Sequence, residues 1–305
     1  MGAAARLRII EKIQKYRRYR ITILRRITQI VSFVVIFGGT LGFAATAIVL
    51  PIRTGLSNPY LIVADAWILL EVMLALALVP LIAIASVSIF SLLIGRTLCG
   101  WVCPFGFIND CIGSIGKKKR VSPRTSMSLW KFALFLAFLW IFIDVSIFYN
   151  ELRNTSIRSS FKEFGYAPST FLDPVTTLFG LLFWYTYHDL WPKEFVDIFY
   201  MPKFFYWRII FLVLVIIGMY YIPRFYCRTL CPLGAIMGLG GQYSLLHIFI
   251  DAARCDECKV CEYVCPMSVP ILSFKDIGDV HSPLCIMCLK CVESCPRGAL
   301  KVRFR

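Results

Sequence analysis

Long apolar segments constrain this chain more than any other feature of its sequence. Four of them, at about 27–50, 67–95, 129–149 and 204–222, are each long enough to cross roughly 30 Å of hydrocarbon as a helix. Helices that are apolar on all sides belong in a bilayer or in the core of a large protein. The sequence therefore predicts an all-α membrane domain with about four transmembrane helices.

A fifth apolar segment, at about 171–184, is shorter and begins with Asp173-Pro174. We expect a re-entrant or interfacial helix here, because the segment is too short for a full span. The alternative is a fifth span, which would place everything after it on the opposite side of the membrane.

Composition and charge agree with a membrane protein. Hydrophobic residues make up 58% of the 305 residues and charged residues 17%, against about 25% in soluble domains, and the mean hydropathy is +0.71. The net charge is +15, and fourteen of these charges lie in residues 1–26 and 96–131. Basic loops mark the cytoplasmic side. We therefore predict a multi-pass protein with both termini cytoplasmic, and no nucleic-acid binding.

The basic run 117–120 fits the same explanation, with binding to anionic lipid of the bilayer as the alternative. The chain divides into a basic N-terminal segment (1–26), a transmembrane domain (27–250) and a small soluble domain (251–305). The last domain is too short for a large apolar core, so it needs a metal centre or another cross-link.

The last domain contains two copies of one cysteine pattern. Each reads Cys-x2-Cys-x2-Cys-x3-Cys-Pro, and in two-cluster proteins the fourth cysteine of each run ligates the other cluster. This spacing predicts an α+β domain with two [4Fe–4S] clusters, and zinc is the alternative metal. We assign one cluster to Cys255, Cys258, Cys261 and Cys295, and the second to Cys265, Cys285, Cys288 and Cys291. The pattern resembles the bacterial two-cluster ferredoxin.

A second repeat lies where two of the predicted spans end. Cys99-x3-Cys103-Pro follows the second span, and Cys227-x3-Cys231-Pro follows the fourth. Two pairs at one depth would supply four thiolates to a third site, for which an iron–sulfur cluster or zinc is the expected occupant. The alternatives are a redox dithiol and small buried thiols with a packing role. Cys111, the thirteenth cysteine, has no partner at a useful spacing and is expected to be a buried apolar residue.

Together, four spans, twin Cys-x3-Cys-Pro motifs and a two-cluster domain resemble the NapH family of ferredoxin-type membrane proteins. The twin motifs are shared with NosR-type and CcoG-type proteins, whose extra domains this chain lacks. The resemblance extends to Asp173-Pro174-Val175-Thr176, although Asp173 stands where the family has Asn. It implies a prokaryotic inner-membrane protein associated with quinol oxidation that feeds respiratory reductases.

A quinone requires an apolar pocket with a few polar groups that exchange protons. The candidates for this role are Glu71, Asp65, Asp144, Asp173 and His188. Intramembrane acids are costly and often functional, whereas snorkelling of Glu71 to the interface is the alternative. His188 lies among Trp and Tyr residues and also fits an interfacial aromatic belt. The predicted spans contain no paired histidines, so we expect no haem b.

We therefore predict an electron-transfer subunit that exchanges electrons between quinone and other redox subunits, such as a second iron–sulfur protein and a cytochrome or reductase. Whether the chain is itself an enzyme depends on quinone reacting at it. Two alternatives belong to other classes: a maturation factor that reduces a metal or disulfide, and a redox sensor.

Overall fold

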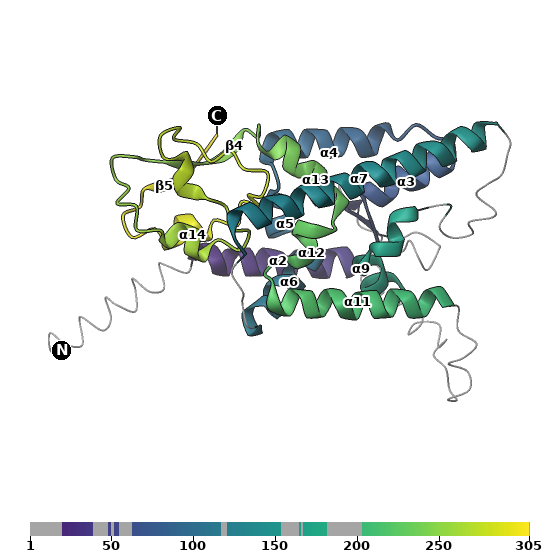
Figure 1. Cartoon of the computed structure of the whole chain (residues 1–305), viewed down its shortest axis with the longest axis horizontal. Coiled ribbons are helices and arrows are strands. Elements are labelled where there is room, and N and C mark those ends of the chain that lie inside the picture. The colour runs from purple at the N-terminus through teal and green to yellow at the C-terminus, as the bar shows by residue number, and fades with distance from the viewer. Residues whose placement is uncertain are drawn as a thin grey trace.

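The computed structural model describes residues 20–38, 48–49, 52–54, 63–116, 121–153, 165, 167–181 and 203–304. These residues form a helical bundle with a small cysteine-rich module at one end, and the bundle and the module follow each other along the longest axis (Figure 1). Helices α2, α4, α7 and α11 run roughly along that axis. The long apolar helices belong to the bundle, and most of the cysteines lie in the module.

The first helix begins and ends earlier than the sequence predicts. Helix α2 spans Arg20–Gly38, so it takes up part of the basic segment 1–26. The apolar run 27–50 is not one helix, because Ile48–Val49 forms strand β1, which pairs antiparallel with β2 (Ile52–Thr54). Strand β3 (Val63–Asp65) pairs with β2 in turn.

The predicted second span, 67–95, is two helices. Helix α3 is Ala66–Ala75 and α4 is Leu81–Ile94, and the two pack against each other as the chain reverses between them (Figure 1). Pro80 causes the break, because it lacks an N–H and disfavours helical backbone in the residue before it. Ala77 adopts the left-handed φ of 55° that the reversal requires.

Two helices of the described residues are long and apolar enough to cross a membrane. They are α7 (Pro123–Leu152) and α11 (Lys203–Tyr221). Large apolar side chains on their outer faces are exposed, among them Phe142 at 71% and Leu214 at 57%. Exposed apolar faces of this extent are typical of surfaces that contact lipid. The other two predicted spans correspond to α2, which has 19 residues, and to the shorter helices α3 and α4.

The described part of the predicted re-entrant segment, up to residue 181, forms short helical pieces. A 3-10 helix, η2 (Pro168–Leu172), is followed by α9 (Pro174–Thr176) and by the π-helical turn η3 (Thr177–Leu181). Asp173 caps α9, because its carboxylate accepts hydrogen bonds from the backbone N–H groups of Val175 and Thr176 at 2.9 and 3.1 Å.

The twin motifs form two matching helix–turn–helix units. Helices α5 (Thr97–Trp101) and α6 (Pro104–Ile115) flank the first turn, and α12 (Phe225–Thr229) and α13 (Pro232–Gly241) flank the second. In each unit the second cysteine is the N-cap and the proline is the first helical residue, which is the position that proline favours.

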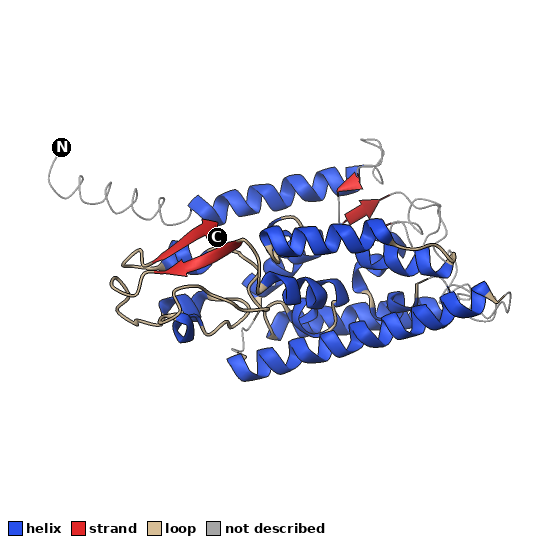
Figure 2. Ribbon diagram, turned by 90° about the horizontal axis from the view of Figure 1, so that it is seen from above, coloured by secondary structure: helices blue, strands red, loops and turns tan. Residues whose placement is uncertain are grey.

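The module is closed by the antiparallel pair β4 (Leu246–Ile250) and β5 (Leu300–Phe304), seen beside the C-terminus in Figure 2. Strand β4 therefore starts before the predicted boundary at 251. Two further short helices are α14 (Val260–Val264) and α15 (Lys290–Ser294), with the 3-10 turn η5 (Ile271–Phe274) between them.

The module is docked on the bundle by its core and by hydrogen bonds. Its buried core continues onto Trp130 and Ala133 of α7 and Ala235 of α13. The Ser126 hydroxyl donates to the Met267 carbonyl at 2.8 Å, and the Trp101 indole donates to the Met287 carbonyl at 2.9 Å. The first turn of α2 donates to Glu293 through the Ile21 N–H at 2.8 Å. The start of α2 and the module consequently lie at the same end of the molecule.

Candidate functional site

Two cavities lie inside the module, and four cysteines line each. The inner cavity is the one nearer the bundle, and the outer cavity is the one farther from it. Their cysteines are the two sets that the spacing predicts, including the exchange of the fourth cysteine between repeats. Two cavities of nearly equal size and identical donors fit two copies of one group. The inner set is Cys265, Cys285, Cys288 and Cys291, and the outer set is Cys255, Cys258, Cys261 and Cys295.

The loops between the cysteines have the same unusual backbone in both repeats. Glu257 and Lys259 have φ of 56° and 60°, and their counterparts Met287 and Leu289 have 49° and 58°. Left-handed residues turn successive N–H groups toward one side and so create a concavity suited to an anion. Cys265 and Cys295 also accept hydrogen bonds on sulfur, from the N–H groups four residues later, at 3.4 and 3.3 Å.

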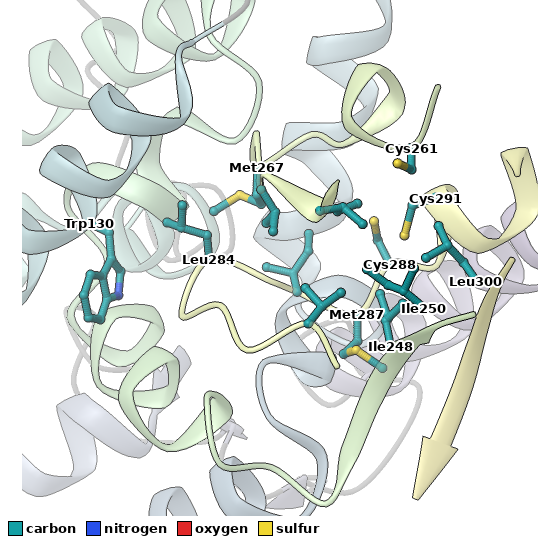
Figure 3. Packing of buried hydrophobic residues seen from close by; sticks show 14 of the residues in the cluster. Trp130, Ile248, Ile250, Cys261, Met267, Leu284, Met287, Cys288, Cys291 and Leu300 are labelled. Carbon is teal, nitrogen blue, oxygen red and sulfur yellow. The ribbon is translucent and has the colours of Figure 1, made fainter. Parts of the chain in front are cut away.

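The cysteines of the inner cavity are more enclosed than those of the outer one. Cys288 and Cys291 are buried and lie among Met267, Met287 and Ile248 in the module core (Figure 3), whereas Cys258 is exposed. Burial raises the pKa of the Cys285 thiol to about 12 and that of Cys261 to about 11. Binding of iron must therefore release protons from these thiols.

A third cavity is enclosed by the twin motifs. Cys99, Cys103, Cys227 and Cys231 all line it, although the two motifs are more than a hundred residues apart in the chain. The rest of its lining is mostly apolar. Burial raises the pKa of Cys103 to about 12, with smaller contributions from Cys227 and Cys99. Four convergent thiols match the donor set of one [4Fe–4S] cluster. We call this the twin-motif cavity.

The two motifs are joined by a reciprocal exchange of arginines. Arg96, the N-cap of α5, donates to the Cys227 carbonyl at 3.0 Å, and Arg224, the N-cap of α12, donates to the Cys99 carbonyl at 2.8 Å. Each guanidinium also passes over a glycine of the other motif. A Cβ at Gly106 would lie 2.9 Å from Arg224 Nη1, and one at Gly234 would lie 2.8 Å from Arg96 Nη2. The motifs are thus related by a local pseudo-two-fold arrangement.

Asp110 anchors one side of this arrangement. Arg224 donates to both of its carboxylate oxygens, at 3.0 and 2.7 Å, and Arg25 lies 3.2 Å away. Burial alone would raise the pKa of Asp110, but the charges of Arg224 and Arg25 outweigh it and hold that pKa well below its usual range. Asp110 is therefore a carboxylate at every physiological pH.

The candidate proton-exchanging residues are not gathered in one place. Asp173 lines the twin-motif cavity and accepts a hydrogen bond from the Tyr226 hydroxyl at 3.1 Å. Glu71 is fully buried and accepts from the Trp67 indole and the Ser169 hydroxyl, both at 2.8 Å. The snorkelling alternative is therefore wrong for Glu71, because the carboxyl is held inside the bundle. Asp65 lies in β3, and His188 lies outside the described residues.

Asp144 lies on α7, which packs against α3, and its charge acts on Glu71. The side chain is 2% exposed, and among the described residues its Oδ2 has no hydrogen-bond partner. Glu71 and Asp144 are thus two buried carboxyl groups on neighbouring helices. Cys111 is half-buried on α6 and lines none of the three cavities.

The sequence reasoning missed the buried arginines. Arg96 and Arg224 occupy the same place before each motif, three residues ahead of the first cysteine, so the repeat itself contained the signal. No comparable sequence pattern identified Asp110 or Tyr226. Their roles depend on partners that are distant in the chain.

Two families match parts of the chain. The family described as a 4Fe-4S binding domain matches residues 76–123 and 204–247, which contain the twin motifs. The family described as a 4Fe-4S dicluster domain matches residues 247–296, which contain the module. Both descriptions favour iron–sulfur clusters over zinc. No solved structure matches the chain.

Curated relatives share about a quarter of their residues with the chain. MJ0749 of Methanocaldococcus jannaschii is 25% identical over 70% of this chain and 66% of its own length. YccM of Escherichia coli, whose name assigns it to electron transport, is 25% identical over 71% of this chain and 53% of its own. The ferredoxin-type protein NapH of Haemophilus influenzae is 26% identical over 74% and 68%.

The chain spans about half to two thirds of these relatives. With two 4Fe-4S domains, apolar helices and these relatives, it is a membrane-associated iron–sulfur protein with a role in electron transfer. Over the twin motifs and the module, the chain is similar to the ferredoxin-type NapH proteins.

Proposed function

We propose that this chain is an integral-membrane subunit that exchanges electrons between the quinone pool and partner redox proteins of a respiratory complex. One observation carries the proposal: the four twin-motif cysteines line a single cavity in the bundle, directly against the cluster module. Cys99 also packs against the module core. Electrons that reach the twin-motif cavity are thus adjacent to the inner cavity.

Three [4Fe–4S] clusters are proposed, one for each cysteine-lined cavity. The inner, outer and twin-motif sets of cysteines would hold them, and such clusters carry single electrons over a wide range of potentials. The protein would exclude water from the inner and twin-motif cavities and would hold the three cavities in sequence along the electron route. Gly100 supports that order, because its backbone lies so close to the module that a Cβ would be 3.8 Å from the Cys288 Cα.

Quinol oxidation releases protons together with electrons, so the site needs proton acceptors. Asp173 and Tyr226 offer a hydrogen-bonded pair in the lining of the twin-motif cavity. Glu71 lies one helical turn beyond Ile68, another lining residue, and with Asp144 it offers a site where a proton is held on the way out.

The opposite end of the proposed route is the outer cavity. Cys258 is exposed at this outer tip of the module, and Glu257 beside it is exposed as well. A soluble iron–sulfur partner would exchange electrons at this tip. We further propose that the module and the start of α2 are cytoplasmic and that the bundle crosses the membrane several times.

The test is reduction of the clusters by quinol in lipid nanodiscs. We expect a short-chain quinol to bleach the visible absorption of the clusters, and quinone to restore it. Asp173→Asn and Glu71→Gln should slow the bleaching while the iron content stays unchanged. Clusters that dithionite bleaches and no quinol bleaches would contradict the quinone role and favour a maturation factor or a sensor.

Iron content tests the third cluster separately. The wild type should hold about twelve irons and as many acid-labile sulfides per chain, against about eight if only the module is loaded. Cys99→Ser and Cys227→Ser should each remove about four irons. Cys111→Ser is the matched control and should remove none. A wild-type count of about eight would contradict a cluster in the twin-motif cavity.

A further inference from the structure

Four buried arginines form a layer between the twin-motif cavity and the inner cavity. This arginine layer consists of Arg25, Arg96, Arg224 and Arg228, none of which is more than 1% exposed. Arg96 bridges the two sides, because it donates to the Cys227 carbonyl and, at 2.9 Å, to the Pro283 carbonyl of the module. Arg228 follows Cys227 directly and donates to the Pro266 carbonyl at 2.6 Å.

The layer carries more positive charge than the protein neutralises. In the described part of the chain, Asp110 is the one carboxylate that forms ion pairs with it, and it also pairs with Arg26 at 3.8 Å. Lys290 adds a further, half-buried cation close to Asp110 and Arg25. Buried charge that lacks a counter-charge is strongly unfavourable. The layer therefore requires additional negative charge close to it.

Arginine N–H groups that have no acceptor indicate the position of this negative charge. Within the described residues, Nε and Nη1 of Arg228, Nε and Nη1 of Arg25 and Nε of Arg96 are buried and have no partner. The charge of Arg228 acts on Cys265 of the inner cavity and on Cys227 of the twin-motif cavity. The charge of Arg25 acts on Cys288. Arg96 lines the twin-motif cavity, and Pro266, which accepts the hydrogen bond of Arg228, lines the inner cavity. The unused donors thus belong to residues that lie next to the two cavities.

Arg224 differs from the other three. Its Nε and Nη2 donate to Asp110 and its Nη1 donates to Cys99, so its donors are used within the protein. Arg224 has the contacts of a structural residue. Arg228 has only one donor in use, and its remaining donors and its charge are available to an anionic group.

We infer that Arg228, assisted by Arg25, raises the reduction potential of the inner cluster relative to the outer cluster. The inference rests on the proposed iron–sulfur function. A cluster becomes more negative by one charge on reduction. A buried cation close to the cluster stabilises the reduced form more than a water-exposed cation does, because water screens the charge of the exposed cation. The outer cavity is lined by residues of the module, and none of the four arginines is among them. Electrons that enter from the bundle would therefore settle on the inner cluster first.

The experiment is a redox titration of the full-length holoprotein in nanodiscs, monitored by electron paramagnetic resonance. Cys258→Ser identifies the signal of the outer cluster. Arg228→Gln should lower the reduced-to-oxidised ratio of the inner cluster about tenfold or more at a fixed poise, which corresponds to 59 mV for one electron. Arg228→Lys, which keeps the charge, should recover most of this shift. Arg254→Gln is the matched control, because Arg254 is an exposed cation of the same module.

An unchanged inner-cluster potential in Arg228→Gln at full iron content would overturn the inference. Equal shifts in both clusters would overturn it as well, because they would indicate a general change in the module. If Arg228→Gln loses iron, the same titration is made with Arg25→Gln, whose side chain comes from α2. Loss of inner-cluster iron from both variants would overturn the inference, because it would show that the arginines hold the cluster in place and do not tune its potential. The titration uses chemical reductants and does not depend on quinol. The inner-cluster potential can therefore be measured even if quinol fails to reduce the clusters.

Discussion

The two cysteine repeats of the module and the two Cys-x3-Cys-Pro motifs of the bundle are both duplications, but they are assembled in different ways. In the module, Cys255 and Cys285 are 30 residues apart, and each repeat shapes its own loop with the same left-handed residues. In the bundle, Cys99 and Cys227 are 128 residues apart, and their alignment depends on Arg96 and Arg224 reaching across to the other motif. One duplication is held by local backbone geometry, and the other by long-range buried charge.

This difference predicts that the bundle, and not the module, loses stability and iron when a buried charge is removed. Asp110→Asn leaves Arg224 and Arg25 buried without their carboxylate, and breaking a buried ion pair costs about 3–5 kcal/mol. We expect a large loss of stability in detergent, measured by thermal unfolding, and loss of about four irons from the twin-motif cavity. The module should keep about eight irons.

The pH dependence of this effect has a definite sign. The folded pKa of Asp110 is depressed, so its contribution to stability is present above the unfolded pKa of about 4 and is lost as the pH falls further. The gap between wild type and Asp110→Asn should be constant between pH 6 and 8 and should narrow below about pH 4. A gap that widens in acid would contradict the assignment.

The same contrast explains what could be predicted from the sequence. The cysteine sets of the module followed from spacing alone, because local loops bring them together, and the twin motifs were visible as a repeat. Pro80 was a missed local signal, since it divides the predicted span 67–95 into a hairpin. The pairing of Glu71 with Asp144 and the arginine layer join residues that are distant in the chain, and no local pattern encodes which of them meet.

Contact between the two regions can be broken at one glycine. A Cβ at Gly100 would lie 2.4 Å from the Ile286 carbonyl oxygen, and both atoms belong to packed backbone. Gly100→Ala should therefore separate the module from α5 and cost about 1–3 kcal/mol, the usual effect of overpacking.

We expect the Gly100→Ala protein to keep its iron but to show slower electron transfer from the twin-motif site to the module, measured by stopped-flow absorption. Gly113→Ala is the matched control. Gly113 lies in helix α6, and a Cβ there meets nothing within 4 Å. Alanine should be neutral or stabilising at that position, because it favours the helix. Equal slowing in both variants would show that the close approach of Gly100 is not needed for transfer.

The smallest predicted effect lies within the module. Gly298 has a φ of 62° and nothing within 4 Å of its Cβ position, and its counterpart in the other repeat is Ser268 with a φ of 56°. Since the first repeat accommodates a side chain in this conformation, Gly298→Ala should cost only the intrinsic strain of left-handed backbone, roughly 1–2 kcal/mol. The iron content and both module potentials should stay unchanged. Loss of the outer cluster would instead show that the two repeats are not equivalent, because Gly298 follows Cys295 of the outer set and Ser268 follows Cys265 of the inner set.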